Sequence, residues 1–246
     1  MALRIGFDLD GVLADMESEL VRQSEILFGE PMTRRLEERA AESGPATEAA
    51  TAAQGAPDAA PEFAPPVARL NMTARQQRRL WHHVESIENF WEGLDELEPG
   101  IIRRLSMLAN ERRWEIIFLT KRPETAGATA QVQSQRWLES KGFALPSVFV
   151  VQGSRGRIAA SLGLDIVVDD RPENCLDVVV DSKARAILVW RAGEQQLPAA
   201  AQRLGIGVVT SVADCLEILT QIDLAAREEP GVISRVMRLL GLKEPV

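Results

Sequence analysis

Two aspartates near the start of the chain have types and spacing suited to chemistry. Asp8 and Asp10 end an apolar run, and Gly11 follows them directly. Alternate side chains of an extended strand point the same way, so both carboxylates would share one face. Such neighbours repel unless a cation or a shared proton relieves them, and Mg²⁺ favours carboxylate oxygens. The spacing predicts a magnesium or acid–base site, with an ordinary acidic turn after a strand as the alternative.

Two later apolar runs also end in polar side chains. Residues 114–119 lead into Thr120, and residues 164–168 lead into Asp169 and Asp170. Parallel strands bring their carboxyl ends to one edge of a sheet, where open α/β folds bind ligands. These side chains are therefore expected to meet the first aspartate pair.

The elements that would position these groups alternate between strand and helix. Further apolar runs lie at residues 147–151, 186–190 and 207–209. Helical patterns are expected near 99–110, 124–141, 157–162, 173–178, 194–204 and 212–226. Strands that alternate with helices indicate an α/β fold with a doubly wound parallel sheet.

In this order, the motifs resemble those of the haloacid dehalogenase superfamily of phosphohydrolases. The matching features are Asp-x-Asp-Gly-Val at 8–12, a strand ending in Thr120, a basic residue before a helix, and Asp169-Asp170. Segments 7–15, 89–100, 135–138 and 168–172 most resemble 5′-nucleotidases of the deoxyribonucleotidase type. The resemblance covers roughly residues 1–30 and 80–190.

The resemblance implies a Rossmann-like core and a small helical cap inserted after the first strand. The expected core is 1–15 and 95–226, and the expected cap is 16–94. Within the cap, helices are expected at 16–28, 31–42 and 73–88. Residues 43–66 are rich in Ala, Gly, Pro, Thr and acidic residues and predict a flexible insertion, with a functional lid as the alternative.

Two smaller features of the chain outside the core leave alternatives open. Phe90 and Trp91 could join the cap to the core by packing or could pack against a nucleobase, and packing with the protein is the preferred interpretation. The tail, 227–246, contains a short basic amphipathic helix that could dock on the core or on a second copy, so a homodimer stays open. Membrane contact is disfavoured because its apolar face is short.

The resemblance also implies roles in a phosphoryl transfer. Asp8 would be the nucleophile that forms an aspartyl-phosphate, and Asp10 the general acid and then base. Mg²⁺ would be held by Asp8, the backbone carbonyl of Asp10, and the pair Asp169 and Asp170. Thr120 would hold a phosphate oxygen.

One basic position departs from the family pattern. The family expects a lysine before the Asp-Asp strand, yet no lysine lies between Lys141 and Lys183. Arg157 is the first candidate for this place because it begins the expected helix, and Arg155 is the second; surface positions for both are the alternative. Lys121, directly after Thr120, could steer an anion or simply belong to a solvated turn.

Composition limits the classes of partner and compartment. The 246-residue chain has a net charge of −8, which disfavours nucleic-acid polymers but not a small anion bound at a local basic site. Its two cysteines have no metal-binding spacing, and no signal peptide or membrane span is evident, so a cytoplasmic protein is expected.

The function that the resemblance implies is a Mg²⁺-dependent phosphatase acting on nucleoside monophosphates or similar small phosphates. Arginine in place of the expected lysine leaves turnover open. A nucleotide-binding or regulatory protein that has lost most of its activity is therefore the alternative.

Overall fold

The computed structural model describes residues 2–29, 72–191, 201 and 203–228, in two compact units. Unit 1 comprises Met1–Asp15, Asp95–Lys121 and Ser134–Val246, and unit 2 comprises Met16–Leu94 and Arg122–Gln133. The sequence predicts that residues 122–133 belong to the core, whereas the structure groups them with unit 2. The helix expected at 31–42, the insertion at 43–66, most of the helix at 194–204 and the tail helix lie outside the described residues.

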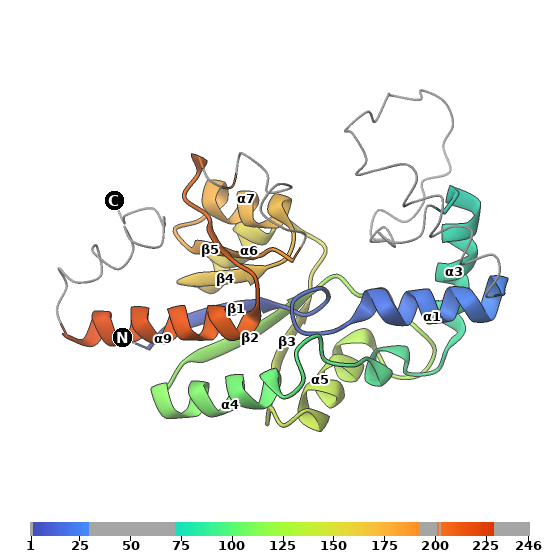
Figure 1. The fold of residues 1–246 in the computed structure, drawn as a ribbon, viewed down its shortest axis with the longest axis horizontal. Helices are drawn as coiled ribbons and strands as arrows, with labels where there is room; N and C mark the ends of the chain where they lie inside the picture. Colours follow the sequence, from blue (N-terminus) through green and yellow to red (C-terminus); the bar gives the residue numbers. More distant parts are fainter. Residues whose placement is uncertain (1, 30–71, 192–200, 202, 229–246) are drawn as a thin grey trace. The chain divides into compact units, whose positions relative to one another are not determined.

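Unit 1 is built on a parallel sheet in which the described residues form six strands, in the order β3-β2-β1-β4-β5-β6 (Figure 1). The strands are β1 (Arg4–Asp8), β2 (Glu115–Thr120), β3 (Ser147–Val150), β4 (Ile166–Asp169), β5 (Arg185–Val189) and β6 (Gly207–Val209). This order is that of a doubly wound α/β fold, so the predicted fold class is confirmed.

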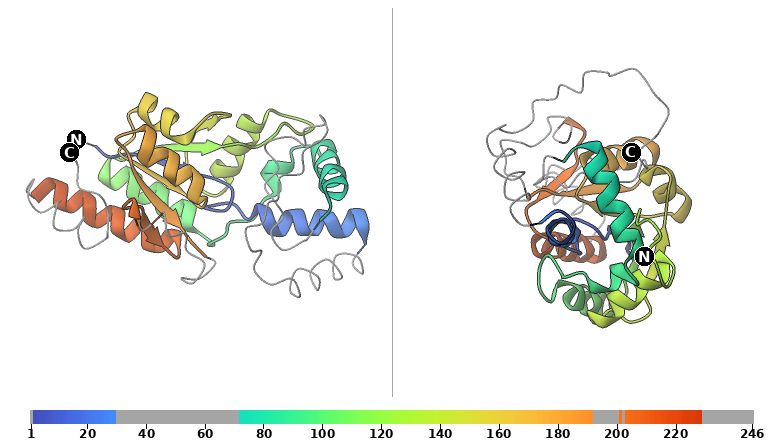
Figure 2. Two further views of the ribbon diagram at one scale, coloured as in Figure 1. Left: turned by 90° about the horizontal axis from the view of Figure 1, so that it is seen from above. Right: turned by 90° about the vertical axis from the view of Figure 1, so that its right-hand side faces the viewer.

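Helices cover both faces of this sheet. After β1 the chain adds β2 and β3 on one side, then returns to add β4, β5 and β6 on the other. Right-handed crossovers in opposite directions place their helices on opposite faces. Accordingly α6 (Arg155–Leu162) and α7 (Pro172–Asp181) lie on one face, and α4 (Ile101–Arg112) and α9 (Val212–Glu228) on the other (Figures 1 and 2).

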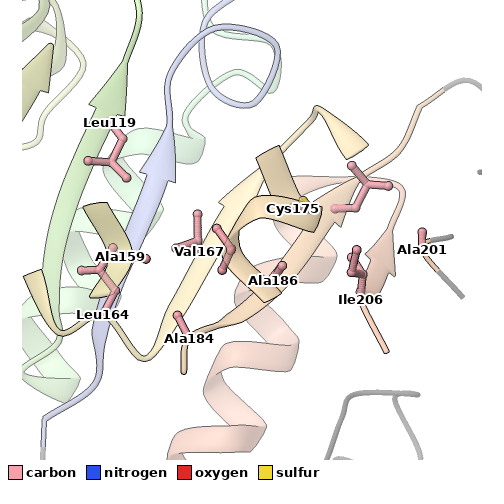
Figure 3. Close-up of a cluster of buried hydrophobic side chains, with 11 residues drawn as sticks. Leu119, Ala159, Leu164, Val167, Cys175, Ala184, Ala186, Ala201 and Ile206 are labelled. Carbon is pink, nitrogen blue, oxygen red and sulfur yellow. The ribbon is translucent and has the colours of Figure 1, made fainter. Parts of the chain in front are cut away.

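The core beneath α6 and α7 is made of small and branched side chains. Leu119 of β2, Val167 of β4 and Leu188 of β5 are buried in one cluster with Cys175 of α7 (Figure 3). All four residues of β4 are buried, as expected for a strand covered on both faces. The buried central strands therefore fix the positions of the residues at and after their carboxyl ends.

One predicted helix begins later than the sequence pattern indicated. The expected helix 124–141 is observed as α5 (Ala130–Ser140). Gly127 adopts a left-handed φ of 97°, and a Cβ there would lie 2.4 Å from Asn89 Oδ1. The Ala128 N–H also donates to Asn89 Oδ1 at 2.9 Å, so residues before Ala130 follow unit 2 instead of continuing the helix.

Unit 2 contains α1 (Met16–Phe28), α3 (Ala74–Ser86) and the 3₁₀ helix η1 (Phe90–Gly93). Thr73 and Gln76 form the reciprocal cap typical of a helix start. Phe90 and Trp91 are buried and meet edge to face, with ring centroids 4.8 Å apart. This burial agrees with the preferred interpretation that the two rings pack against the protein.

The described helices include none that is both long enough and apolar enough to cross a membrane.

The two cysteines provide a test of the core. Cys175 and Cys215 are free and buried, and burial raises the pKa of both thiols. Because the thiolate is the reactive form, both should react far more slowly with 5,5′-dithiobis(2-nitrobenzoate) in the native protein than in guanidinium chloride. Single Cys→Ser variants assign the two rates, and rapid labelling of either native thiol would contradict the buried placement.

Candidate active site

The carboxyl ends of three neighbouring strands form one edge of the unit 1 sheet. Asp8 ends β1 and pairs in register with Leu119 of β2, so Thr120 lies one residue beyond it. On the other side of β1, Phe7 pairs with Val168 of β4, and Asp169 follows. The strand order reverses between β1 and β4, which is the position where open α/β sheets bind ligands.

The loop after β1 curls back on itself over this edge. The N–H groups of Leu13 and Ala14 donate to the Leu9 carbonyl at 2.9 and 2.8 Å, and the Gly11 N–H donates to the Ala14 carbonyl at 3.1 Å. Gly11 has a φ of 85°, and a Cβ there would lie 2.0 Å from Asp170 Oδ2. Only glycine therefore lets the loop follow this path and lie against the carboxylate.

The Asp10 side chain is fixed by the neighbouring strand. Thr120, fully buried at the end of β2, donates its hydroxyl proton to Asp10 Oδ2 at 3.0 Å. Lys121 follows at the same edge and is half-buried. The structure thus brings the Asp-x-Asp pair and the threonine together, as the sequence indicated.

A buried arginine stands between two of the carboxylates. The Arg155 side chain is 2% exposed, its Nη2 pairs with Asp8 Oδ1, and its Nε lies 3.4 Å from Asp169 Oδ2. The guanidinium supplies the positive charge that two buried carboxylates need. Arg155 is therefore the basic residue of the site.

The preference for Arg157 over Arg155 as the basic residue beside the carboxylates was wrong. The helix was expected to begin at residue 157, but α6 begins at Arg155. Residues two apart on a helix point about 200° away from one another, so only one can face the sheet edge. Arg155 does so, and Arg157 is exposed.

Two residues that sequence reasoning missed complete the arrangement. The Asn174 amide Nδ2 lies 3.0 Å from both carboxylate oxygens of Asp169. A Cβ on Gly156 would lie 2.0 Å from the Asp177 carbonyl oxygen, so this glycine lets α6 approach α7 closely. In the sequence, Gly156 could have been found as a glycine next to Arg155, and Asn174 as a polar residue in the first turn of α7.

Burial and mutual repulsion shape the electrostatics of the carboxylates. Burial raises the pKa of Asp8 well above its ordinary value, the Arg155 guanidinium opposes this effect, and Asp169 adds to it. Burial, followed by the charge of Asp169, raises the pKa of Asp170 to about 7. Additional positive charge at this edge would therefore stabilise the ionised carboxylates.

The donor chemistry fits a hard cation such as Mg²⁺. Asp170 Oδ1 is buried and has no hydrogen-bond partner among the described residues. Taken as they stand, the described side chains include no set of three or more His, Cys, Asp or Glu that surrounds a common point. The unpartnered oxygen and the crowded carboxylates still match the oxygen ligands that Mg²⁺ prefers.

Replacing Gly11 tests this geometry. Gly11→Ala forces a left-handed alanine and moves Asp170, so the free energy of unfolding should fall by about 1–3 kcal/mol. Gly93→Ala is the matched control, because Gly93 has no positive φ and no atom within 4 Å of its added Cβ. Urea denaturation measures both variants, and equal stabilities would exclude the close contact.

No protein-family model matches this sequence, and no curated protein matches it. Among solved structures, the chain is similar to a Thermotoga maritima protein provisionally described as a beta-phosphoglucomutase, with a TM-score of 0.53 and 17% identity over 89% of this chain and 99% of that one.

Two further similar structures are those of proteins named as haloacid dehalogenase-like or HAD family hydrolases. A haloacid dehalogenase-like hydrolase from Streptococcus pneumoniae gives a TM-score of 0.49 and 13% identity, over 89% of this chain and 98% of that one. A HAD family hydrolase from Deinococcus radiodurans, with bound phosphate and sodium, gives a TM-score of 0.48 and 16% identity, over 89% of this chain and 96% of that one. Similarity to the Thermotoga protein at 17% identity establishes a shared fold: a parallel six-stranded sheet with flanking helices.

Proposed function

We propose that this protein is a Mg²⁺-dependent phosphomonoesterase that acts through an aspartyl-phosphate. The observation that carries the proposal is the buried Asp8 carboxylate at the end of β1, between the Thr120–Asp10 pair and the Arg155–Asp169 pair. The resemblance of the motifs to the haloacid dehalogenase superfamily supports the same chemistry.

Asp8 is the nucleophile in this proposal. Its Oδ1 pairs with Arg155, so Oδ2 is the oxygen available for attack on phosphorus. A new bond forms between Oδ2 and phosphorus as the bond from phosphorus to the ester oxygen breaks. The Arg155 guanidinium opposes the rise that burial causes in the pKa of Asp8, and it would neutralise charge as the phosphoryl group arrives.

Asp10 transfers the protons. It donates a proton to the leaving ester oxygen, which departs as an alcohol, and then accepts a proton from the water that attacks the aspartyl-phosphate. That second step breaks the bond between Asp8 and phosphorus, releases inorganic phosphate, restores the Asp8 carboxylate and leaves Asp10 protonated for the next cycle. The hydrogen bond from Thr120 holds Asp10 in one orientation throughout.

The residues that would hold Mg²⁺ are Asp8, the backbone carbonyl of Asp10, and the pair Asp169 and Asp170. Bound there, the ion would neutralise carboxylate and phosphate charge together. Asn174 holds Asp169 in place through both of its oxygens. Such outer partners orient the ligands of a metal.

A small phosphorylated compound is the proposed substrate, with nucleoside monophosphates the first class to test. Support for nucleotides comes from the motif segments that resemble deoxyribonucleotidases. Lys121, half-buried beside Thr120, is a candidate for attracting the phosphate. A screen of nucleotides, sugar phosphates and small phosphate esters with Mg²⁺ would separate these classes.

A second candidate function is a phosphate-binding protein with little turnover. The observation that favours it is the direct pairing of Asp8 with an arginine, whose planar fork differs from the point charge of a lysine. Tight binding of a phosphate compound without Mg²⁺-dependent phosphate release would favour this candidate over the enzyme.

The nucleophile is tested by Asp8→Asn. This change should lower Mg²⁺-dependent phosphate release by at least about a thousandfold, because an amide cannot form the covalent intermediate. Asp165→Asn is the control, since Asp165 precedes β4 at the opposite end of the strand and is exposed. Phosphate release that survives in Asp8→Asn would rule out the proposed nucleophile.

The two arginines give a matched pair for stability and activity. Arg155→Gln leaves Asp8 and Asp169 buried without their cation, which should lower the free energy of unfolding by about 3–5 kcal/mol, and Arg155→Lys should restore part of the loss. Arg157→Gln should stay within about 0.5 kcal/mol of the unchanged protein. Urea denaturation and phosphate release measure all three, and similar losses at both positions would contradict the assignment.

A further inference from the structure

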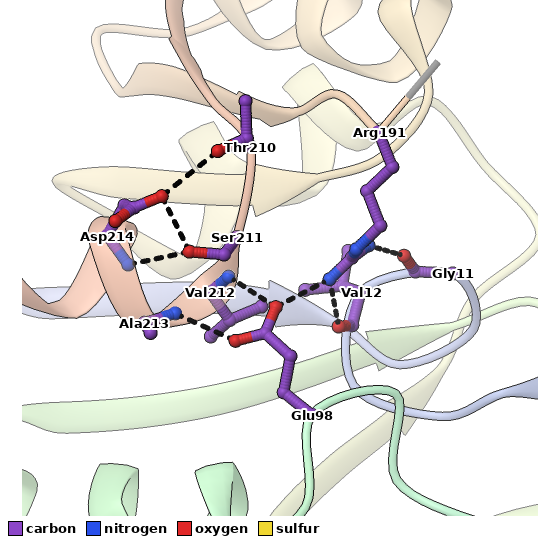
Figure 4. A network of polar contacts seen from close by, with 9 residues as sticks. All are labelled: Gly11, Val12, Glu98, Arg191, Thr210, Ser211, Val212, Ala213 and Asp214. Carbon is purple, nitrogen blue, oxygen red and sulfur yellow. Dashed lines mark hydrogen bonds and ion pairs between the residues drawn. The ribbon is translucent and has the colours of Figure 1, made fainter. Parts of the chain in front are cut away.

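We infer that Arg191 is a positioning residue for the loop that carries Asp10, an inference that rests on the proposed function. Arg191 follows β5 and lies 180 positions from Gly11 in the sequence. Its Nη1 donates to the Gly11 carbonyl at 2.6 Å, and its Nη2 donates to the Val12 carbonyl at 3.3 Å (Figure 4). One side chain thus holds two successive peptide groups directly after Asp10.

Glu98 fixes the arginine itself. Its Oε1 accepts from Arg191 Nη2 at 2.9 Å and from the Val212 N–H at 2.7 Å, and its Oε2 accepts from the Ala213 N–H at 2.9 Å. The carboxylate therefore satisfies backbone donors at the start of α9, where the helix dipole favours negative charge. Figure 4 shows Glu98 between the α9 start and Arg191, so the arginine is anchored to a helix end.

The contacts of Gly11 explain why the hold of Arg191 on the loop matters for the proposed chemistry. Its α-carbon lies against the Asp170 carboxylate, and its carbonyl is held by Arg191. Movement of this peptide would displace Asp10 from its hydrogen bond with Thr120. In this inference, Arg191 thus holds the loop that carries the proton-transferring Asp10 in its place beside the Asp170 carboxylate.

Arginine suits this role better than lysine. Its planar fork presents two donors to two carbonyls and a further contact to Glu98, whereas a lysine ammonium is a single point of charge. The arrangement requires no contact between Arg191 and the substrate. Its loss should therefore alter kcat and leave KM nearly unchanged.

Kinetics give the first test. Arg191→Met should lower kcat for phosphate release by about 10- to 100-fold, as is typical when an outer partner of a site is removed. Arg191→Lys should recover part of that loss. Glu98→Gln combined with Arg191→Met should be no slower than Arg191→Met alone, because both changes release the same loop.

Ser211→Ala is the matched structural control. Ser211 caps the same helix by accepting from the Asp214 N–H at 3.0 Å and donating to Asp214 Oδ2 at 2.6 Å, without touching the loop. This variant should lower the melting temperature and leave kcat unchanged. An equal fall of kcat in Ser211→Ala and Arg191→Met would mean that Arg191 acts only through general stability and would overturn the inference.

Hydrogen–deuterium exchange tests the loop directly and does not depend on turnover. In Arg191→Met, but not in Ser211→Ala, the amides of Gly11, Leu13 and Ala14 should exchange faster, because their hydrogen bonds lie within the released loop. Unchanged exchange, or faster exchange with unchanged kcat, would overturn the inference. An unmutated protein without phosphatase activity would refute the proposed function instead, while the exchange result would still decide whether Arg191 holds the loop.

Discussion

The ion pairs of Arg155 are the interaction on which the rest of the site depends. Asp8 and Asp169 are both buried at neighbouring strand ends, where desolvation and mutual repulsion disfavour their ionised forms. The Arg155 guanidinium, which stays charged between them, opposes both effects, although the pKa of each carboxyl still lies above its ordinary value. Protonation would prevent both nucleophilic attack and cation binding, so the charge of Arg155 favours the ionised form that the proposed chemistry needs.

Close backbone approaches make this arrangement possible. Gly156 lets α6 lie against α7, which brings Arg155 to the sheet edge, and Gly11 lets the loop after β1 lie against Asp170. In both places a Cβ would overlap a neighbouring oxygen. The charges therefore converge because these two glycines let backbone segments pack more closely than residues with a Cβ could. Arg191 then holds the loop after β1 through the carbonyl groups of Gly11 and Val12.

Unit 2 depends on a different kind of interaction. Trp91 is fully buried, donates its indole N–H to the Pro123 carbonyl at 3.0 Å, and stacks beneath the Arg122 guanidinium. The buried amide of Gln133 accepts from the Trp91 backbone N–H at 3.0 Å. These contacts explain why residues directly after Lys121 belong to this unit and do not extend α5 toward its amino end.

The sequence by itself determined the α/β fold class and the convergence of Asp8, Asp10, Thr120 and Asp169, because strand periodicity and parallel strand ends are local rules. Only the tertiary structure decided which arginine serves the site. Arg155 and Arg157 lie on opposite faces of α6, and the close packing of α6 against α7 at Gly156 decides which of them meets the sheet edge. The contacts of Arg191 with Gly11 and of Asn174 with Asp169 likewise needed the folded chain, since hydrogen bonds between separate elements leave no period in the sequence.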